Sequence, residues 1–201
     1  MTDLFNPDRA ALLDKWPSML KTCRAISPWT SDAELAWLTE AASTRQTVGE
    51  VGSYKGKTAK ALAWRCPGKV YCVDCFVDET FADCRSNLDE ELRHEEVILF
   101  PLESAAGAAT LRDQGIAFDL FFIDGAHDTP SVIRDIGLWL PLMKPGAILC
   151  GHDCFPQSGN GTGPNDVCQA LMAALPDYTL VMDSIWAWQV PAPCSQPLLT
   201  P

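Results

Sequence analysis

The stretch Val48-Gly49-Glu50-Val51-Gly52-Ser53-Tyr54-Lys55-Gly56-Lys57-Thr58 decides the fold of this chain. Residues 47–51 are mostly compatible with a strand, and Gly52 and Gly56 then bracket a tight turn. Strong helix formers follow over residues 58–65, so the stretch predicts a strand, a glycine loop and a helix in direct succession. Such a loop lets the backbone approach a ligand closely, at a helix N-terminus whose free N–H groups favour anions.

Three classes of ligand use this geometry: dinucleotides, nucleoside triphosphates and S-adenosylmethionine. The dinucleotide fingerprint G-x-G-x-x-G does not match, because the glycines here are spaced as Gly-x-x-Gly-x-x-x-Gly over residues 49–56. A P-loop, G-x-x-x-x-G-K-T, would need glycine at position 51, where Val51 stands. The third class fits without adjustment, as an acidic strand end before a glycine loop, Glu50-x-Gly52-x-x-x-Gly56. A strand-to-helix turn that binds no ligand stays open as well.

Length and composition predict one soluble domain. The chain has 201 residues, of which 47% are hydrophobic, so it can bury a full core. Its net charge of −11 argues against binding to nucleic acid or to anionic membranes, since both need clustered Lys and Arg. The first residues are acidic and turn-like rather than a basic and apolar leader, and no apolar run approaches the roughly 20 residues that span a bilayer. We therefore expect a cytoplasmic protein with neither nucleic-acid nor membrane partners.

The chain contains nine cysteines, and without a secretory leader we expect reduced thiols. The spacings Cys72-x-x-Cys75 and Cys150-x-x-x-Cys154 suggest a zinc hypothesis, especially with His152 inside the second group. The two groups fall on different strand ends, however, and there is no second C-x-x-C. Buried structural cysteine is therefore the favoured interpretation.

The first 45 residues are predicted to be helical, and Ser31-Asp32-Ala33-Glu34 forms a capping box that opens a helix to about Ser43. After this segment, strands and helices alternate. Strands are predicted at 47–51, 69–74, 96–101, 118–124, 147–151, 179–182 and 185–190. Helices are predicted near 79–93, 104–114, 131–142 and 165–175. Only Asp183-Ser184 separates the last two strands, so these must pair as an antiparallel hairpin.

This pattern predicts an α/β fold, with a doubly wound, mostly parallel sheet of seven strands that ends in a C-terminal antiparallel hairpin. Such a hairpin distinguishes the methyltransferase version of the doubly wound fold from its nucleotide-binding relatives. In these sheets, ligands bind outside the carboxyl ends of the strands. That rule brings together five residues as candidates: Gly52, Asp74, Glu103, Asp124 and Asp153.

From about Val48 to Val190 the chain resembles the class I S-adenosylmethionine-dependent methyltransferases. It is most similar to a group that includes the macrolide-sugar O-methyltransferases, with catechol O-methyltransferase a more distant relative. The resemblance rests on the glycine loop and on Phe121-Phe122-Ile123-Asp124-Gly125-Ala126-His127, which continues to Gly151-His152-Asp153. It implies methyl transfer to a small hydroxylated acceptor. A P-loop-like nucleotide enzyme and a noncatalytic cofactor-binding module are the alternatives.

The resemblance also divides the chain. Residues 46–201 are expected to form the S-adenosylmethionine-binding methyltransferase domain. Residues 1–45 are expected to form a helical lid or a dimerisation segment, which makes a homodimer one expectation. The glycine-rich segment 157–164 is predicted to be a mobile lid beside the site.

For the cofactor, the resemblance implies a set of loop and strand-end residues: Glu50, Gly52, Ser53, Tyr54, Gly56, Asp74, Ser104 and Asp124. Asp74 ends the second strand, where an acid can accept both ribose hydroxyls; a solvated loop acid is the alternative. Glu50 is expected to bind the ligand's ammonium or to order the loop; a strand-end acid that only caps the turn is the alternative. Ser104 is expected to contact the adenine, to cap the following helix, or both.

Asp124 and Asp153 end neighbouring strands, where two carboxylates would repel unless a cation or proton lies between them. Oxygen ligands suit Mg²⁺, and in the related enzymes such a metal holds the acceptor hydroxyls. His152 stands where catechol-type relatives carry an aspartate, which indicates a softer or weaker site formed by Asp124, His152 and Asp153. Pairing of both acids with backbone amides is the alternative without a metal.

His127 is the predicted general base and acts beside Asp124. It lies three residues beyond Asp124, and an imidazole can accept the proton that a hydroxyl acceptor must lose. The sugar-modifying relatives carry histidine at this point. A helix-capping or merely polar loop histidine is the alternative.

Overall fold

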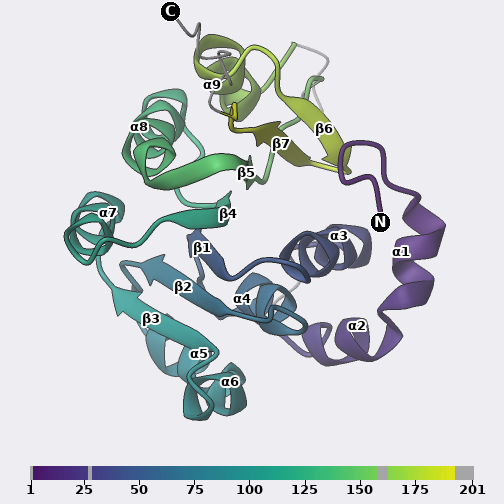
Figure 1. The fold of residues 1–201 in the computed structure, drawn as a ribbon, viewed down its shortest axis with the longest axis vertical. Coiled ribbons are helices and arrows are strands. Elements are labelled where there is room, and N and C mark those ends of the chain that lie inside the picture. Colours follow the sequence, from purple (N-terminus) through teal and green to yellow (C-terminus); the bar gives the residue numbers. More distant parts are fainter. Residues whose placement is uncertain (1, 27–28, 158–162, 193–201) are drawn as a thin grey trace, which may run out of the picture.

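The computed structural model describes residues 2–26, 29–157 and 163–192, and its centre is a seven-stranded sheet (Figure 1). The strand order is β3-β2-β1-β4-β5-β7-β6. The strands are β1 (Thr47–Val51), β2 (Lys69–Asp74), β3 (Val97–Pro101), β4 (Phe118–Ile123), β5 (Met143–Gly151), β6 (Thr179–Met182) and β7 (Ile185–Gln189). All pairs among β1 to β5 are parallel, whereas β7 runs antiparallel to both β5 and β6. The predicted mostly parallel sheet with its C-terminal hairpin is confirmed.

Helices cover both faces of the sheet (Figure 1). One face carries α1 (Arg9–Lys15), α2 (Pro17–Cys23), α3 (Asp32–Ala42), α4 (Lys57–Ala63), α5 (Thr80–Asn87) and α6 (Asp89–Arg93). The other face carries α7 (Ser104–Asp113), α8 (Thr129–Trp139) and α9 (Asp166–Ala174), and a 3₁₀ turn, η1 (Leu140–Leu142), leads from α8 into β5.

Each face of the sheet has its own core because side chains alternate along every strand. On β4, Phe122 belongs to the core beneath α3 and α4, together with Trp37. Its neighbour Phe121 belongs to the opposite core, where its ring stacks on Trp139 at a centroid distance of 4.3 Å. Burial on both faces explains why β4 is almost continuously apolar.

Several predicted boundaries differ from the structure, two of them by the most. The helix predicted over 79–93 is divided into α5 and α6, because Leu88 leaves the helical conformation (φ −107°, ψ 16°) and is fully buried in the core. Strand β5 begins at Met143 rather than at 147, with an irregular register against β4 before Leu120. Residues 158–162 of the predicted lid lie outside the described residues. Within the described ranges, no helix combines the length and the apolar character needed to cross a membrane.

Candidate active site

The glycine loop forms the tight turn that the sequence predicts. Gly52 and Gly56 both have positive φ, +95° and +83°, and Gly56 is the N-cap of α4. A Cβ atom on Gly52 would lie 1.9 Å from the carbonyl oxygen of Asp124, so a side chain there would collide with the backbone that follows β4. The loop after β1 and the end of β4 are therefore held in direct contact.

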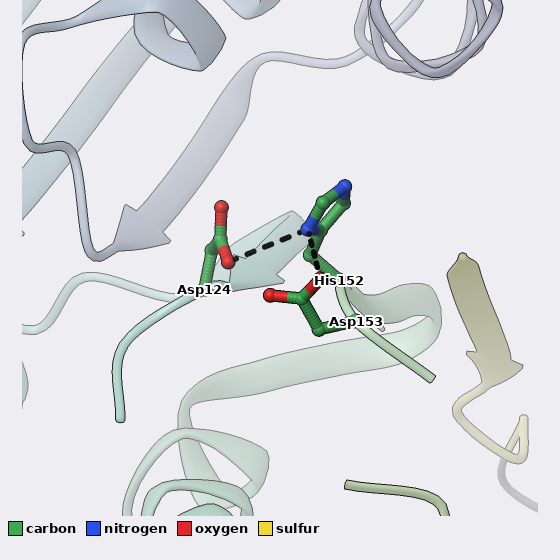
Figure 2. A group of neighbouring side chains, drawn as sticks. All are labelled: Asp124, His152 and Asp153. Carbon is green, nitrogen blue, oxygen red and sulfur yellow. Dashed lines mark ion pairs between the residues drawn. The ribbon is translucent and has the colours of Figure 1, made fainter. Parts of the chain in front are cut away.

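Parallel pairing continues one residue past the strands and brings the acids together. The backbone N–H of Asp124 donates to the carbonyl of Val51 (2.9 Å), and the N–H of His152 donates to the carbonyl of Ile123 (3.1 Å). Asp153 follows with φ +60°, in the left-handed region that aspartate tolerates better than most residues. The side chains of Asp124, His152 and Asp153 face one another, with one donor atom from each all within 4.8 Å of the others (Figure 2).

His152 is buried between carboxylates. Its Nδ1 lies 3.2 Å from Oδ1 of Asp153 and 3.8 Å from Oδ1 of Asp124, while Nε2 lies 3.2 Å from Oε1 of Glu34. Burial, the largest single influence, would lower the pKa of His152, but Asp153, Glu34 and Asp124 together raise that pKa to about 10. The same contact with His152 lowers the pKa of Asp153. One imidazolium thus offsets part of the negative charge of three carboxylates.

His127 reaches the same acids from the loop after β4. Its Nε2 lies 3.4 Å from Oδ1 of Asp124 and 3.2 Å from Oδ2 of Asp153. The contact with Asp124 raises the pKa of His127 above its usual value, and partial burial opposes this rise. The side chain is 54% exposed, so one part of the ring is open to solvent and to an incoming molecule.

A cavity of about 300 Å³ lies against this cluster. It is lined by the glycine loop, the start of α4, the acid–histidine cluster and the segment before α3: Trp29, Thr30, Gly52, Ser53, Tyr54, Lys55, Lys57, Thr58, Asp124, His127, His152 and Asp153. Trp29 is 77% exposed, although it is a large apolar residue. The Nζ of Lys57 donates to the carbonyl of Thr30 (3.0 Å), which links the first turn of α4 to this wall.

Asp74 and Ser104 lie outside the cavity lining. The carboxylate of Asp74 accepts the backbone N–H groups of Tyr54 (2.8 Å) and Phe76 (2.6 Å), so it holds the glycine loop against the end of β2. The Ser104 hydroxyl donates to Asp135 (2.7 Å) and accepts the indole N–H of Trp139 (3.0 Å). The predicted capping role of Ser104 is wrong, because residue 103 occupies the N-cap of α7 and the Ser104 side chain is held by α8.

Glu50 lies beneath the glycine loop and is fully buried. Neither of its carboxylate oxygens has a hydrogen-bond partner among the described residues, and the same holds for the hydroxyl of Ser53. Burial raises the pKa of Glu50 to about 7, and the nearby Ser53, Thr58 and Cys72 side chains oppose that rise. A buried carboxylate without a partner fits a site that receives a cationic group.

Two residues of this region were not predicted from the sequence. Glu34 was assigned only to a capping box and Ser184 only to a hairpin turn, yet both contact the cluster: Glu34 lies against His152, and the Ser184 hydroxyl accepts the N–H of Asp153 (3.3 Å). The capping box itself is present. No local pattern marks the contact, because α3, β5 and the β6–β7 turn are far apart in the chain.

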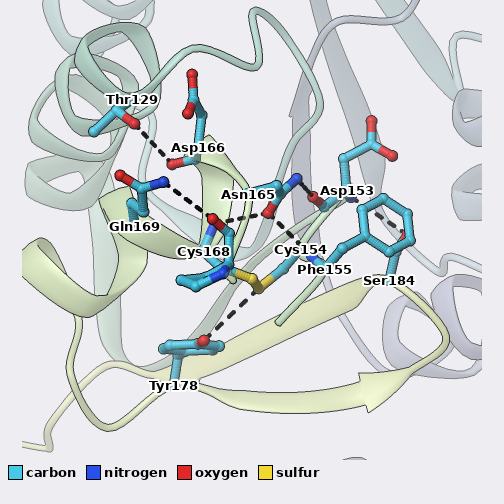
Figure 3. The surroundings of a disulfide bond; sticks show 11 residues. Thr129, Asp153, Cys154, Phe155, Asn165, Asp166, Cys168, Gln169, Tyr178 and Ser184 are labelled. Atoms are coloured by element: carbon cyan, nitrogen blue, oxygen red, sulfur yellow. Dashed lines mark hydrogen bonds between the residues drawn. A yellow bond between two sulfur atoms is a disulfide. The ribbon is translucent and has the colours of Figure 1, made fainter. Parts of the chain in front are cut away.

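The cysteine prediction is wrong at one pair. Cys154 and Cys168 form a disulfide with a Cα–Cα distance of 5.0 Å, and both side chains are fully buried (Figure 3). Helix α9 packs beside the segment after β5 and brings the two sulfurs together, which spacing along the chain does not indicate. Cys72 and Cys150 are free and buried, as the favoured interpretation predicts, whereas Cys75 is free but exposed, which contradicts it.

A family model described as "Methyltransferase domain" matches residues 50–154, more than half of the chain. The chain belongs to this methyltransferase family. The match includes the glycine loop, Asp124, His127 and the His152–Asp153 pair. It supports the predicted class I methyltransferase and not the P-loop alternative.

Solved structures agree with this fold. An O-methyltransferase from Bacillus cereus in complex with SAH is 18% identical, with 90% of each chain covered and a TM-score of 0.63. TomG from Streptomyces achromogenes, an O-methyltransferase involved in tomaymycin synthesis and solved with SAM, is 17% identical, with 90% of each chain covered and a TM-score of 0.65. A methyltransferase from Podospora anserina bound to SAH is 16% identical, covers 89% of this chain and 92% of its own, and has a TM-score of 0.62. A comparison with curated protein sequences finds no significant match.

Proposed function

We propose that this methyltransferase transfers the methyl group of S-adenosylmethionine to a hydroxyl of a small acceptor, assisted by a divalent cation. The observation that carries the proposal is the shared cavity. The glycine loop and the cluster of Asp124, His127, His152 and Asp153 line the same space of about 300 Å³. A cofactor held by the loop and an acceptor held by the cluster would therefore meet within one pocket, and alignment of this kind contributes strongly to catalysis.

The cofactor is assigned to the loop and strand ends at the first half of the sheet. Gly52 and Gly56 give the loop its shape, with Ser53 and Tyr54 between them. Asp74 is assigned to the ribose hydroxyls, Ser104 to the adenine end, and Asp124 to the junction between cofactor and acceptor. Glu50 is assigned to the ammonium group, either directly or by ordering the loop, because its carboxylate is buried without a partner among the described residues.

The cation is assigned to Asp124, His152 and Asp153. Two carboxylate oxygens and one imidazole nitrogen within 4.8 Å of one another fit a divalent ion in number, charge and spacing. Because one donor is an imidazole, Mn²⁺ or another transition metal suits the set at least as well as Mg²⁺. When bound, such an ion supplies a positive charge that holds the acceptor oxygen and lowers its pKa.

His127 is assigned the role of general base. Its partly exposed ring lines the cavity, and its Nε2 lies within 3.4 Å of Asp124 and 3.2 Å of Asp153. These acids hold the ring in place and stabilise the proton once it has been taken. The acceptor is expected to pass Trp29 on its way to His127, since Trp29 is an exposed aromatic side chain in the cavity wall. This gives residues 1–45 a role as a lid over the acceptor.

Calorimetry tests the cofactor assignment without knowledge of the acceptor. S-adenosylmethionine, S-adenosylhomocysteine, ATP and NAD are titrated into the protein, each with and without Mg²⁺ or Mn²⁺. We expect micromolar binding of the first two ligands and none of the others. The substitution Asp74→Ala should weaken that binding at least about tenfold, or ~1.4 kcal/mol, whereas Asp78→Ala, at an exposed acid between β2 and α5, should leave it unchanged. Binding of ATP with no binding of S-adenosylhomocysteine would overturn the assignment.

A further inference from the structure

The carboxylate of Glu34 is shared between a helix cap and the candidate active site. Its Oε2 accepts the backbone N–H of Ser31 (2.8 Å), which completes the capping box of α3. Its Oε1 accepts both the N–H (3.0 Å) and the hydroxyl (2.7 Å) of Ser184, and lies 3.2 Å from Nε2 of His152. The residue is only 3% exposed. The capping box uses only the contact of Oε2 with Ser31. The contacts of Oε1 with Ser184 and His152 are additional to the cap.

Glu34 lies on the edge of the His152 ring that faces away from the acids. Nε2 lies 3.2 Å from Oε1 of Glu34, an ion-pair distance, although it forms no hydrogen bond among the described residues. Nδ1 lies 3.2 Å from Asp153 and 3.8 Å from Asp124 (Figure 2). A cation bound at Nδ1 would displace the proton there and leave the ring proton on Nε2, where the carboxylate of Glu34 would stabilise it. Glu34 would thus favour Nδ1, which faces Asp124 and Asp153, as the ligating nitrogen.

Ser184 links Glu34 to a second residue of the cluster, Asp153. Its hydroxyl donates to Glu34 and accepts the backbone N–H of Asp153 (3.3 Å). Its carbonyl accepts the N–H of Cys154 (3.0 Å). Ser184, in the turn between β6 and β7, therefore connects Glu34 to the backbone N–H groups of Asp153 and Cys154. These bonds hold the backbone segment that carries the Asp153 side chain.

We propose that Glu34 is a positioning residue that orients His152 for metal binding through Nδ1 and couples helix α3 to the metal centre. The inference rests on the proposed function, because it assumes that Asp124, His152 and Asp153 hold a divalent cation. Carboxylates that orient metal-binding histidines in this way are worth roughly 10–100-fold in metal affinity.

The test measures Mn²⁺ binding by calorimetry, with no acceptor and no turnover. Three proteins are compared at one pH: the wild type, Glu34→Gln and Ser31→Ala. Gln keeps the size of Glu34 but removes its charge. Ser31→Ala is the matched control, because it removes the Ser31 hydroxyl, which accepts the Glu34 N–H and donates to Asp183, and leaves the Glu34 carboxylate in place. Circular dichroism and thermal unfolding report whether each variant is folded.

We expect Glu34→Gln to weaken Mn²⁺ binding roughly 10–100-fold and Ser31→Ala to leave it unchanged. Equal affinity of the wild type and folded Glu34→Gln would overturn the role of Glu34 while leaving the metal site intact. Equal weakening in both variants would show that Glu34 acts only through the helix cap. Absence of Mn²⁺ binding by the wild type would instead overturn the metal in the proposed function, and the inference with it.

A second measurement decides the matter if Glu34→Gln does not fold. Long-range ¹⁵N–¹H correlation spectra of the wild type loaded with Zn²⁺ report the state of each imidazole nitrogen. We expect the His152 ring to carry its proton on Nε2 and the metal on Nδ1. A metal on Nε2, or an unliganded His152, would contradict the proposal.

Discussion

The Nε2 atom of His127 lies 3.2 Å from Oδ2 of Asp153, although the ring itself is 54% exposed. The side chain is therefore held by an acid without being enclosed. Contact with Asp124 raises the pKa of His127, so the ring holds its proton to a higher pH than an ordinary histidine. A cation bound by the same acids would offset their field and return the pKa of His127 toward neutrality.

This arrangement predicts the effect of removing the base. His127→Ala should lower kcat by roughly 10²–10⁴-fold, the usual contribution of a positioned proton acceptor, with little change in affinity for S-adenosylhomocysteine. The pH–rate profile of the wild type should rise through an apparent pKa at or above that of histidine. His127→Gln keeps a polar side chain but cannot take the proton. If it retained normal kcat and the same pH profile, His127 would have no part in the chemistry.

The ion pair of His152 with Glu34 and Asp153 predicts how stability depends on pH. The pKa of His152 is raised from 6.5 to about 10 in the folded protein, so the folded state binds this proton more tightly than the unfolded state. The resulting stabilisation is complete below pH 6.5 and is lost as the pH rises toward 10. Urea unfolding in EDTA should show this loss for the wild type. His152→Asn should be less stable at pH 6 and should lose less stability up to pH 10, and parallel curves for the two proteins would rule out the assigned protonation.

The Glu50 carboxylate should favour binding of the cofactor but lower the stability of the cofactor-free fold. Its pKa is raised from 4.5 to about 7, so its ionisation opposes folding as the pH rises through this interval. Glu50→Gln should therefore stabilise the cofactor-free protein above pH 7, by up to about 3 kcal/mol, and should weaken S-adenosylhomocysteine binding by roughly tenfold or more.

The control for Glu50 is Glu96→Gln, a change at an exposed acid just before β3. Its unfolding free energy should change by no more than about 0.5 kcal/mol. Unfolding curves and calorimetry at pH 8 measure both effects. A Glu50→Gln protein that is less stable and binds normally would show that Glu50 is structural.

The sequence carried enough information to predict the fold and most of the cluster. Apolar strands with acids at their ends place Asp124 and Asp153 at one edge of a parallel sheet, and the two-residue turn at Asp183-Ser184 requires a hairpin. Both kinds of signal are local, or follow from the rule that parallel strands end on the same side. The strand-end acids and the hairpin could therefore be predicted from the sequence alone.

Contacts that depend on packing between distant elements could not be predicted. Glu34 reaches His152 only because α3 lies beside the hairpin, and nothing in its capping-box pattern distinguishes it from an ordinary helix start. Ser104 looked like a helix cap, but Asp135 and Trp139 of α8 hold its hydroxyl. The spacing of cysteines suggested Cys150 as the neighbour of Cys154, whereas packing of α9 selects Cys168.

The disulfide should contribute measurably to stability. Cys154 and Cys168 are 14 residues apart, and closing a loop of this size stabilises the folded state by about 3 kcal/mol in the chain-entropy model. Dithiothreitol should lower the urea midpoint of the wild type, and Cys154→Ser/Cys168→Ser should have that lower midpoint with or without reductant. Peptide mapping without reductant should recover the linked pair. Free thiols at both positions in protein purified under air would contradict the assignment.

Anomalous diffraction at the manganese edge tests the metal centre most directly, using crystals of the wild type grown with S-adenosylhomocysteine and MnCl₂. We expect one strong peak bounded by Oδ atoms of Asp124 and Asp153 and by Nδ1 of His152, and no peak there in Asp124→Asn/Asp153→Asn crystals. A wild-type map with no peak at this position, in crystals that bind S-adenosylhomocysteine at the glycine loop, would show that the acids and histidines balance one another without a metal.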